Sequence, residues 1–350
     1  MKTVNTVVRS VVRSVGAAAK AIFSRGIGAA ALVCALAPVG VLFAQQGAQR
    51  DIAVYQVRPN FYMISGAGAN IGVQFGSDGV VVADTGTQEA SAAVLAEIRK
   101  LSDKPVRYII NTSADADSAG GNATIAKAGQ SIFSGVSGPR SDFVKAMTGG
   151  LASIVAHENV LTRMSAPTGK ASPFPSDGWP SEAFATNRRY LYLNHEGIEV
   201  LHQPAAHSDG DSVVFFRGSD VVMAGDILDT TRLPVIDVER GGGIEGEIDA
   251  LNRLIELAIP SVPFIFQPGG TYVIPGHGRI YDQADIVEYR DMIVILRDVI
   301  QDMKQHGMTL AQIQAANPVL PYEKQYGAKS GAWTTNNFIE AVYKSAAVKK

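Results

Sequence analysis

The chain has 350 residues, of which 46% are hydrophobic and 18% charged, and its formal net charge at pH 7 is −2. This composition is typical of a globular protein and excludes a disordered or fibrous chain. The charge is nearly balanced and no run of lysine and arginine is present, so we expect no nucleic-acid partner.

The first 44 residues have the composition of a secretory signal peptide. They contain five basic residues and no acidic residue, and an apolar run ends at Ala44 before a polar Q-Q-G. These are the parts of a cleaved signal. An uncleaved anchor is the alternative, because the run approaches the roughly 17 to 20 residues that span a bilayer, but Pro38 and the high alanine content favour cleavage. We therefore expect export to the periplasm or the extracellular space, without stable membrane insertion after cleavage.

The only cysteine, Cys34, lies within this segment, so residues 45–350 contain none. Disulfides, thiolate metal ligands and a cysteine nucleophile are thereby excluded from the mature chain. The mature chain carries 26 basic and 33 acidic residues, a net charge of −7. We expect a soluble exported protein.

The first half of the mature chain predicts a hairpin and then a crossover between parallel strands. Residues 71–75 and 80–84 are strands joined by the turn G-S-D-G. A helix with apolar residues at helical spacing follows and leads to the strand R-Y-I-I at 107–110. Because such crossovers are right-handed and join parallel strands, Asn111 should lie at a carboxyl strand end, where open α/β sheets bind ligands.

Three further segments complete this half. Residues 131–135 predict a short strand, residues 140–165 a helical region, and residues 167–180, rich in proline, glycine and serine, a surface loop.

The second half repeats the β-rich pattern. Two β-rich halves with flanking helices predict an α/β fold of four layers, an αββα sandwich, as one domain over 45–350 with a mostly helical segment from about 282. The expected strands are 189–193, 198–202, 212–217, 221–226 and 271–275, and the expected helix before the last strand is 245–259.

Acids and histidines recur at the predicted strand ends. His207 precedes a strand, Asp226 follows one, and His277 follows another between two glycines. Asp115 and Asp117 lie in the loop after Asn111. These residues are five candidate metal ligands from four separate loops.

The ordered set of motifs resembles the metallo-β-lactamase superfamily over about residues 52–345. The resemblance implies a sandwich of the metallo-β-lactamase type and a metal-dependent hydrolase. The motifs are D-T-G at 84–86, N-T-x-x-D-x-D-x-x-G-G-N at 111–122, H-S-D-G-D at 207–211, A-G-D at 224–226 and P-G-H-G at 275–278.

Members of this family hold one or two zinc or iron ions with an H-x-H-x-D-H loop, two later histidines and a bridging aspartate. The residues that match this pattern are Asp117, His207, Asp226 and His277. The loop departs from it at three positions, where Ser113, Asp115 and Ser118 stand in place of histidines.

The altered ligand set predicts one metal site. Pooled, Asp115, Asp117, His207, Asp226 and His277 can still close a site for one divalent ion. The resemblance implies zinc, whereas three carboxylates shift the preference towards manganese or iron(II). Without a cation, three clustered carboxylates would repel one another and raise the pKa of at least one of them.

Two functions follow as alternatives. In the first, metal-activated water attacks an ester, amide, lactone or phosphodiester bond of a small-molecule substrate, with Asp117 as general base. In the second, the chain is a catalytically inactive pseudoenzyme that binds a ligand or a partner, as Ser113 and Ser118 suggest. No feature of the sequence selects a substrate or an oligomeric state.

Four other residues receive supporting roles. Ser118 is expected to cap the helix that follows it, and Asp84 to brace the ligand loop by hydrogen bonds. Asp211 is expected to support the site from a turn, and His157 to be structural or to form a cleft wall.

Overall fold

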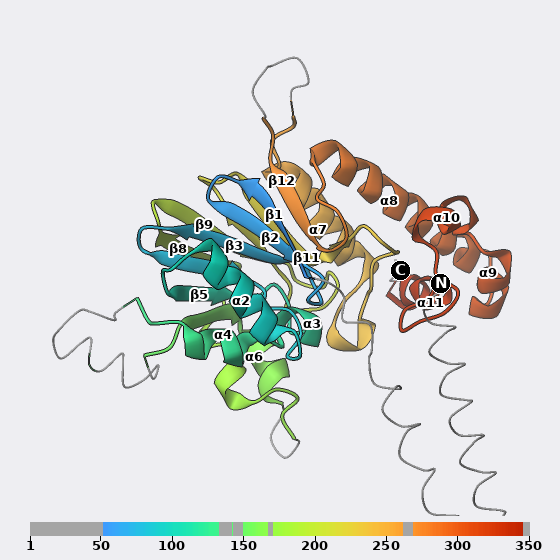
Figure 1. Cartoon of the computed structure of the whole chain (residues 1–350). Helices are drawn as coiled ribbons and strands as arrows, with labels where there is room; N and C mark the ends of the chain where they lie inside the picture. The colour runs from blue at the N-terminus through green and yellow to red at the C-terminus, as the bar shows by residue number, and fades with distance from the viewer. Residues whose placement is uncertain (1–51, 133–141, 143–149, 167–170, 262–268, 346–350) are drawn as a thin grey trace, which may run out of the picture. The chain divides into compact units, whose positions relative to one another are not determined.

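The computed structural model describes residues 52–132, 142, 150–166, 171–261 and 269–345 (Figure 1). The predicted signal peptide lies outside these residues. Within the described ranges, no helix combines the length and the apolar character needed to cross a bilayer.

Seven strands form the first sheet, in sequential order from β1 to β7. The pairs from β1 to β4 are antiparallel and those from β4 to β7 parallel. The predicted hairpin (β3 and β4) and the predicted crossover (β4 to β5) are confirmed. The strands are Ala53–Arg58 (β1), Phe61–Ser65 (β2), Ile71–Gly76 (β3), Gly79–Ala83 (β4), Val106–Ile110 (β5), Ser153–His157 (β6) and Glu182–Phe184 (β7).

Five strands form the second sheet, in the order β12-β11-β10-β9-β8. All its pairs are antiparallel except β11 with β12, which run parallel. Asp229 on β11 lies opposite His277 on β12 in this register. The strands are Arg188–Leu193 (β8), Glu196–His202 (β9), Ser212–Phe216 (β10), Val221–Asp229 (β11) and Tyr272–His277 (β12).

Helices occupy the crossovers and the carboxyl-terminal part of the domain. The longest, α8, begins with a capping box in which Asp282 and Asp285 each accept a hydrogen bond from the other's backbone N–H. The α-helices are Ser91–Leu101 (α2), Ala116–Ala119 (α3), Asn122–Ala128 (α4), Glu158–Ser165 (α6), Ile244–Leu257 (α7), Gln283–Gln305 (α8), Leu310–Ala316 (α9), Glu323–Tyr326 (α10) and Thr335–Ser345 (α11). The 3₁₀ turns are Ser176–Gly178 (η1), Val238–Arg240 (η2) and Leu320–Tyr322 (η3).

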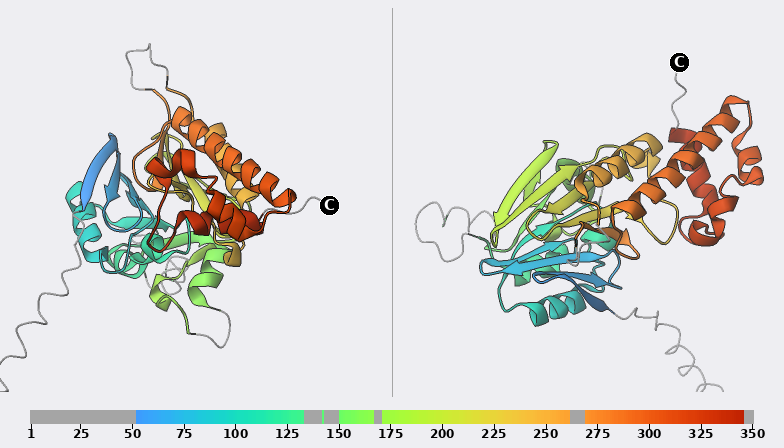
Figure 2. Two further views of the ribbon diagram at one scale, coloured as in Figure 1. Left: turned by 90° about the vertical axis from the view of Figure 1, so that its right-hand side faces the viewer. Right: turned by 90° about the horizontal axis from the view of Figure 1, so that it is seen from above.

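Apolar side chains separate four layers, which the right-hand view of Figure 2 shows edge-on. Val94 of α2 and Ile125 of α4 pack on the outer face of the first sheet. A second cluster fills the space between the sheets, and a third packs α7, α8 and α11 on the outer face of the second sheet. Adjacent residues of β10 alternate accordingly, since Val213 faces the helices and Val214 the other sheet. The predicted α/β fold, a four-layer αββα sandwich, is confirmed.

The predicted helical region 140–165 is partly wrong. Ser153–His157 is β6, a fully buried strand that pairs with β5 and β7, whereas Asp142 and Glu158–Ser165 are helical. A short apolar run such as S-I-V-A cannot be assigned to helix or strand by its periodicity. Of the predicted strand 131–135, Ser131 and Ile132 lie outside any strand, and the rest falls outside the described residues.

Glu247 on α7 is a buried acid whose removal should stabilise the fold. Its side chain is fully buried and neither carboxyl oxygen has a hydrogen-bond partner among the described residues. Burial raises its pKa well above the usual range, so the folded state retains its proton. Because an unpaired buried polar group costs about 1–3 kcal/mol, we expect Glu247→Leu to increase the free energy of unfolding by about that amount.

The gain in unfolding free energy from Glu247→Leu should increase with pH. Since the pKa of Glu247 is higher in the folded state, its proton stabilises that state fully only below its unfolded pKa of about 4.3. Wild-type stability from this group is therefore lost as pH rises, and the advantage of Glu247→Leu should be larger at pH 8 than at pH 5. Urea unfolding of both proteins at the two pH values measures it, and a destabilised variant would contradict the expectation.

Candidate metal centre

The loop after β5 is held closed by two asparagines. The side chains of Asn111 and Asn122 exchange hydrogen bonds, 3.0 Å from Asn111 Nδ2 to Asn122 Oδ1 and 2.8 Å in the other direction. The hydroxyl of Thr85 also donates to Asn122 Oδ1 at 3.0 Å. All three side chains are buried. This clamp explains why the loop motif begins and ends with asparagine.

Asp84 braces the same loop, as predicted. Its carboxylate accepts hydrogen bonds from the backbone N–H of Thr112 at 2.8 Å and from the Thr112 hydroxyl at 2.6 Å. The residue is fully buried and has φ of 60°, which few non-glycine residues adopt. Burial raises the pKa of Asp84 to about 8, in spite of the two hydrogen bonds that stabilise the ionised form.

Two glycines allow close approaches of the backbone at the ends of β11 and β12. Gly225 has φ of 56°, and a Cβ there would lie 2.3 Å from the hydroxyl of Thr112. Gly278 has φ of 97°, and a Cβ there would lie 2.0 Å from the hydroxyl of Thr230. Both positions therefore require glycine. They place Asp226 and His277, the neighbours of these glycines, beside the loop.

All five predicted ligands line one small cavity of about 50 Å³. The loop after β5 and the start of α3 supply Asp115 and Asp117, and the β9–β10 connection supplies His207. Asp226 belongs to β11 and His277 ends β12. The remaining lining residues are Asp229, Arg232 and Val235. Residues far apart in sequence thus converge where two parallel strands of each sheet end.

Three of the five residues form a group with the spacing of a metal site. Asp115, His207 and Asp226 each offer one ligand atom, and these atoms lie within 4.8 Å of one another. The Nε2 atom of His207 lies 3.4 Å from Oδ2 of Asp115. Ligands at 2.0–2.2 Å from one ion are at most about 4.4 Å apart, so a small inward adjustment closes the group. This nitrogen and oxygen donor set fits zinc, manganese or iron(II).

The surroundings of His207 also fit a ligand role. Its side chain is 3% exposed, and its Nδ1 lies 3.2 Å from Oδ1 of Asp211. Asp211 also accepts hydrogen bonds from the backbone N–H and the hydroxyl of Ser208. A carboxylate on one ring nitrogen orients the other nitrogen towards a metal. Asp211 therefore holds His207 with Nε2 facing the cavity.

Asp117 and His277 form a separate pair beside this group. The Nε2 atom of His277 lies 3.2 Å from Oδ2 of Asp117 and 3.9 Å from Oδ1 of Asp226. The hydrogen bond with His277 lowers the pKa of Asp117. Burial disfavours the protonated form of His277, but Asp117 and Asp226 raise its pKa overall. The pair thus combines an ionised acid with a proton donor.

Both serines at the altered positions face Asp226. The hydroxyl of Ser113 donates to Oδ2 of Asp226 at 2.6 Å, and that of Ser118 lies 3.5 Å from the same oxygen. The predicted helix cap at Ser118 is wrong. Ser118 lies inside α3, the N-cap position of α3 is Asp115, and that of α4 is Gly121. The chain therefore uses short hydroxyl groups to stabilise the Asp226 carboxylate.

Three charged residues of the centre have no place in the sequence prediction. Arg240 donates from Nη1 to Oδ1 of Asp115 at 3.0 Å. Arg232 donates from Nε to Oδ2 of Asp229 at 2.6 Å. Asp229 could have been suspected, because it is a second acid at the end of β11. Arg240 lies 125 residues from Asp115, and no sequence pattern indicates their contact.

A larger cavity of about 580 Å³ adjoins the centre through Ala114 and Arg240. Its volume is that of a small-molecule pocket. Apolar and charged side chains line it together, among them Pro173, Phe174 and Arg163. Another cavity, of about 640 Å³, contains none of the five predicted ligands.

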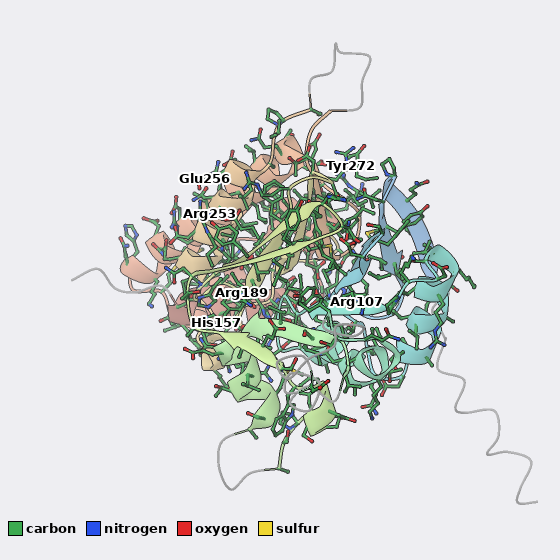
Figure 3. The ribbon with its side chains drawn as sticks, turned by 90° about the vertical axis from the view of Figure 1, so that its left-hand side faces the viewer. Arg107, His157, Arg189, Arg253, Glu256 and Tyr272 are labelled. Atoms are coloured by element: carbon green, nitrogen blue, oxygen red, sulfur yellow. The ribbon has the colours of Figure 1, made fainter. Side chains whose placement is uncertain are left out.

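His157 is a structural residue, one of its two predicted roles. It ends β6, and its ring caps α6 by accepting a hydrogen bond from the N–H of Asn159. The ring also stacks on His202, with centroids 3.5 Å apart. His157 is labelled in Figure 3.

Metal binding at His207 should release a proton. Burial opposes protonation of His207, but the charge and hydrogen bond of Asp211, with the charges of Asp226 and Asp115, raise its pKa to about 10. A metal ligand must be neutral, so at lower pH the ion displaces the proton. We expect the metal affinity to rise about tenfold per pH unit below pH 10.

Isothermal titration calorimetry of zinc or manganese binding measures this effect. Titrations at pH 6.5 and 7.5, in buffers with different heats of ionisation, should give release of about one proton per ion. Binding without proton release would contradict the assignment of His207 as a protonated ligand.

Comparisons with known proteins bear on the family and the fold. No curated protein sequence matches the chain. Similar solved structures include the inverting sec-alkylsulfatase Pisa1 from Pseudomonas sp., at 16% identity and a TM-score of 0.58 over 85% of this chain and 50% of that one. The chain thus spans about half the length of that alkylsulfatase. A double mutant of the same enzyme gives 15% identity and a TM-score of 0.59, over 84% of this chain and 50% of that one.

A metallo-beta-lactamase from Pontibacter korlensis matches at 16% identity and a TM-score of 0.48, over 70% of this chain and 99% of that one. The sequence family described as the metallo-beta-lactamase superfamily matches residues 65–277, more than half of the chain. This span contains all eight residues that line the small cavity, including the five predicted ligands. The chain belongs to the metallo-beta-lactamase superfamily.

Proposed function

We propose that the protein is a metal-dependent hydrolase with an altered site for a single divalent ion. The observation that carries this proposal is the group of Asp115, His207 and Asp226, with ligand atoms within 4.8 Å of one another. Asp117 and His277 flank the group and line the same small cavity. Zinc is the first candidate from the family, and manganese or iron(II) from the carboxylate content.

The bound ion and the residues around the group would have separate chemical roles. A bound divalent ion supplies Lewis acidity, which lowers the pKa of water and polarises the bond to be cleaved. Asp117 stays ionised because of His277, so it can orient the attacking water and accept its proton. His277, with its raised pKa, can donate a proton to the leaving group. Asp211 holds His207 in place.

The adjoining cavity of about 580 Å³ is the proposed substrate site. It reaches the centre at Ala114, the residue before Asp115, and apolar residues such as Phe174 line part of it. An ester, amide, lactone or phosphodiester of a small molecule fits this description. We add sulfate esters to these candidate substrates because an alkylsulfatase has a similar fold.

A hydrolysis screen tests the proposal. The protein is loaded with zinc, manganese or iron(II) and assayed with these five bond types, with Asp117→Asn as the variant that lacks the proposed base. We expect metal-dependent turnover of at least one class and a loss of roughly a hundredfold or more in Asp117→Asn. Absence of turnover with every ion would contradict the proposed hydrolase activity.

A binding module without hydrolysis is the second candidate. The ion pairs of Asp115 with Arg240 and of Asp117 with His277 favour it, because they already neutralise two carboxylates without a metal. A chain that binds no ion but retains a small-molecule ligand in the larger cavity would support this alternative.

We also propose export, from the composition of residues 1–44. Amino-terminal sequencing of the chain recovered from its native host tests it. A mature chain that begins near residue 45 would support the proposal, and one that retains residues 1–44 would contradict cleavage.

A further inference from the structure

Arg240 contacts one of the proposed metal ligands directly. Its Nη1 donates to Oδ1 of Asp115 at 3.0 Å, while Oδ2 of the same carboxylate faces Nε2 of His207 at 3.4 Å. A carboxylate oxygen that accepts from a guanidinium has fewer lone pairs for a metal ion. The guanidinium also places its positive charge beside Oδ2 of the same carboxylate, so Arg240 and a divalent ion compete for the negative charge of Asp115.

The backbone of Arg240 is fixed, so its side chain begins from a defined position. Its N–H donates to Oδ1 of Asp237 at 2.9 Å, and its carbonyl accepts from Arg163 at 2.6 Å and from the N–H of Asp209 at 3.0 Å. The guanidinium also lies 3.3 Å from Asp237. Because the backbone is anchored, forming the ion pair with Asp115 costs less conformational entropy.

Arg240 also faces the larger cavity. It lines that cavity together with Arg163, Asp209 and Ala114. Its side chain is 48% exposed, so an anion in the cavity can reach the guanidinium. Guanidinium groups bind sulfate, phosphate and carboxylate through paired hydrogen bonds. One side chain thus contacts both the proposed metal site and the proposed substrate site.

We propose that Arg240 is a built-in counter-ion that competes with the metal for Asp115, and that an oxyanion in the larger cavity relieves this competition. The inference rests on the proposed metal-binding function. It assigns the substrate site to molecules that carry an oxyanion group. By linkage, an anion that strengthens metal binding is itself bound more tightly when the metal is present.

Metal affinity, measured by calorimetry, tests the first half of the inference. A partly exposed ion pair corresponds to a factor of about five, so Arg240→Gln should bind zinc about five times more tightly than wild type. Arg232→Gln removes a charge that lines the small cavity of the predicted ligands but pairs with Asp229, outside the three-residue ligand group. Arg253→Gln removes a surface charge that pairs with Glu256 on α7, where Figure 3 labels both residues.

The variants separate competition from a general charge effect. A gain confined to Arg240→Gln supports the inference, whereas an equal gain in Arg232→Gln overturns it. Equal affinity of wild type and Arg240→Gln overturns the role of Arg240 and leaves the metal site intact. Absence of metal binding in both proteins overturns this inference and the proposed function together.

Sulfate tests the second half. Excess sodium sulfate should tighten zinc binding to wild type by up to the same factor of about five, relative to sodium chloride of equal ionic strength. Arg240→Gln should show no such difference between the two salts. An equal response of both proteins, or none in wild type, would overturn the coupling.

Discussion

Asp226→Asn is expected to reduce metal affinity by more than about a hundredfold and to reduce any metal-dependent turnover in parallel. Asp226 belongs to the three-residue group, and its Oδ1 also lies 3.9 Å from Nε2 of His277. The asparagine has the same shape but no charge to offer a cation. Loss of a residue that merely supports a ligand costs 10–100-fold in affinity, so loss of a ligand should cost more. Calorimetry and the hydrolysis assay measure the two effects.

Asp229→Asn is the matched control for this change. Asp229 lies on the same strand and lines the same cavity, but its carboxylate accepts hydrogen bonds from Thr231 and Arg232 and is outside the three-residue group. Asp229→Asn should reduce metal affinity by a factor at least about ten times smaller than the factor for Asp226→Asn. This is the effect expected for a residue that supports a ligand. Wild-type affinity in Asp226→Asn, with the fold verified by circular dichroism, would remove Asp226 from the site.

Asp84→Ala is expected to destabilise the fold by about 3 kcal/mol. The change leaves the N–H and the hydroxyl of Thr112 without their buried acceptor, and each buried polar group left unsatisfied costs about 1–3 kcal/mol. Asp84→Asn should cost less than about 1 kcal/mol, because an amide can still accept from the Thr112 N–H and asparagine tolerates a positive φ. Urea unfolding of the three proteins measures both effects.

The comparison of wild type with Asp84→Asn should also depend on pH. Burial raises the pKa of Asp84 in the folded state to about 8, above its unfolded value of about 3.9. The stabilisation from its proton is therefore complete below about pH 4 and is lost as pH rises to about 8. Wild type should lose stability relative to Asp84→Asn between pH 5 and pH 8. A difference that does not vary with pH would mean that Asp84 is ionised throughout.

The layers of the fold were predictable because local patterns determine them. The hairpin of β3 and β4, the crossover to β5 and the strands of the second sheet follow from alternating or continuous apolar runs bounded by turn residues. Strand β6 was not predictable in this way. Its run S-I-V-A-H is buried on both faces and continues directly into α6, so no change of periodicity marks the boundary.

The candidate site was predictable where the ligands stand at strand ends. His207, Asp226 and His277 follow from strand positions and motifs, and the structure brings them to one cavity with Asp115 and Asp117. The contacts of Arg232 and Arg240 in the centre were not predictable. A single arginine in a sequence carries no information about which acid it will contact.

The most direct test of the account is the stoichiometry and location of bound metal. Wild type and His207→Ala are dialysed against zinc or manganese at pH 7.5, and bound metal is measured by elemental analysis. We expect one ion per wild-type chain and less than about a tenth of that in His207→Ala, because His207 is the imidazole of the three-residue group. Two ions per wild-type chain, or full occupancy in His207→Ala, would contradict a single site built on Asp115, His207 and Asp226.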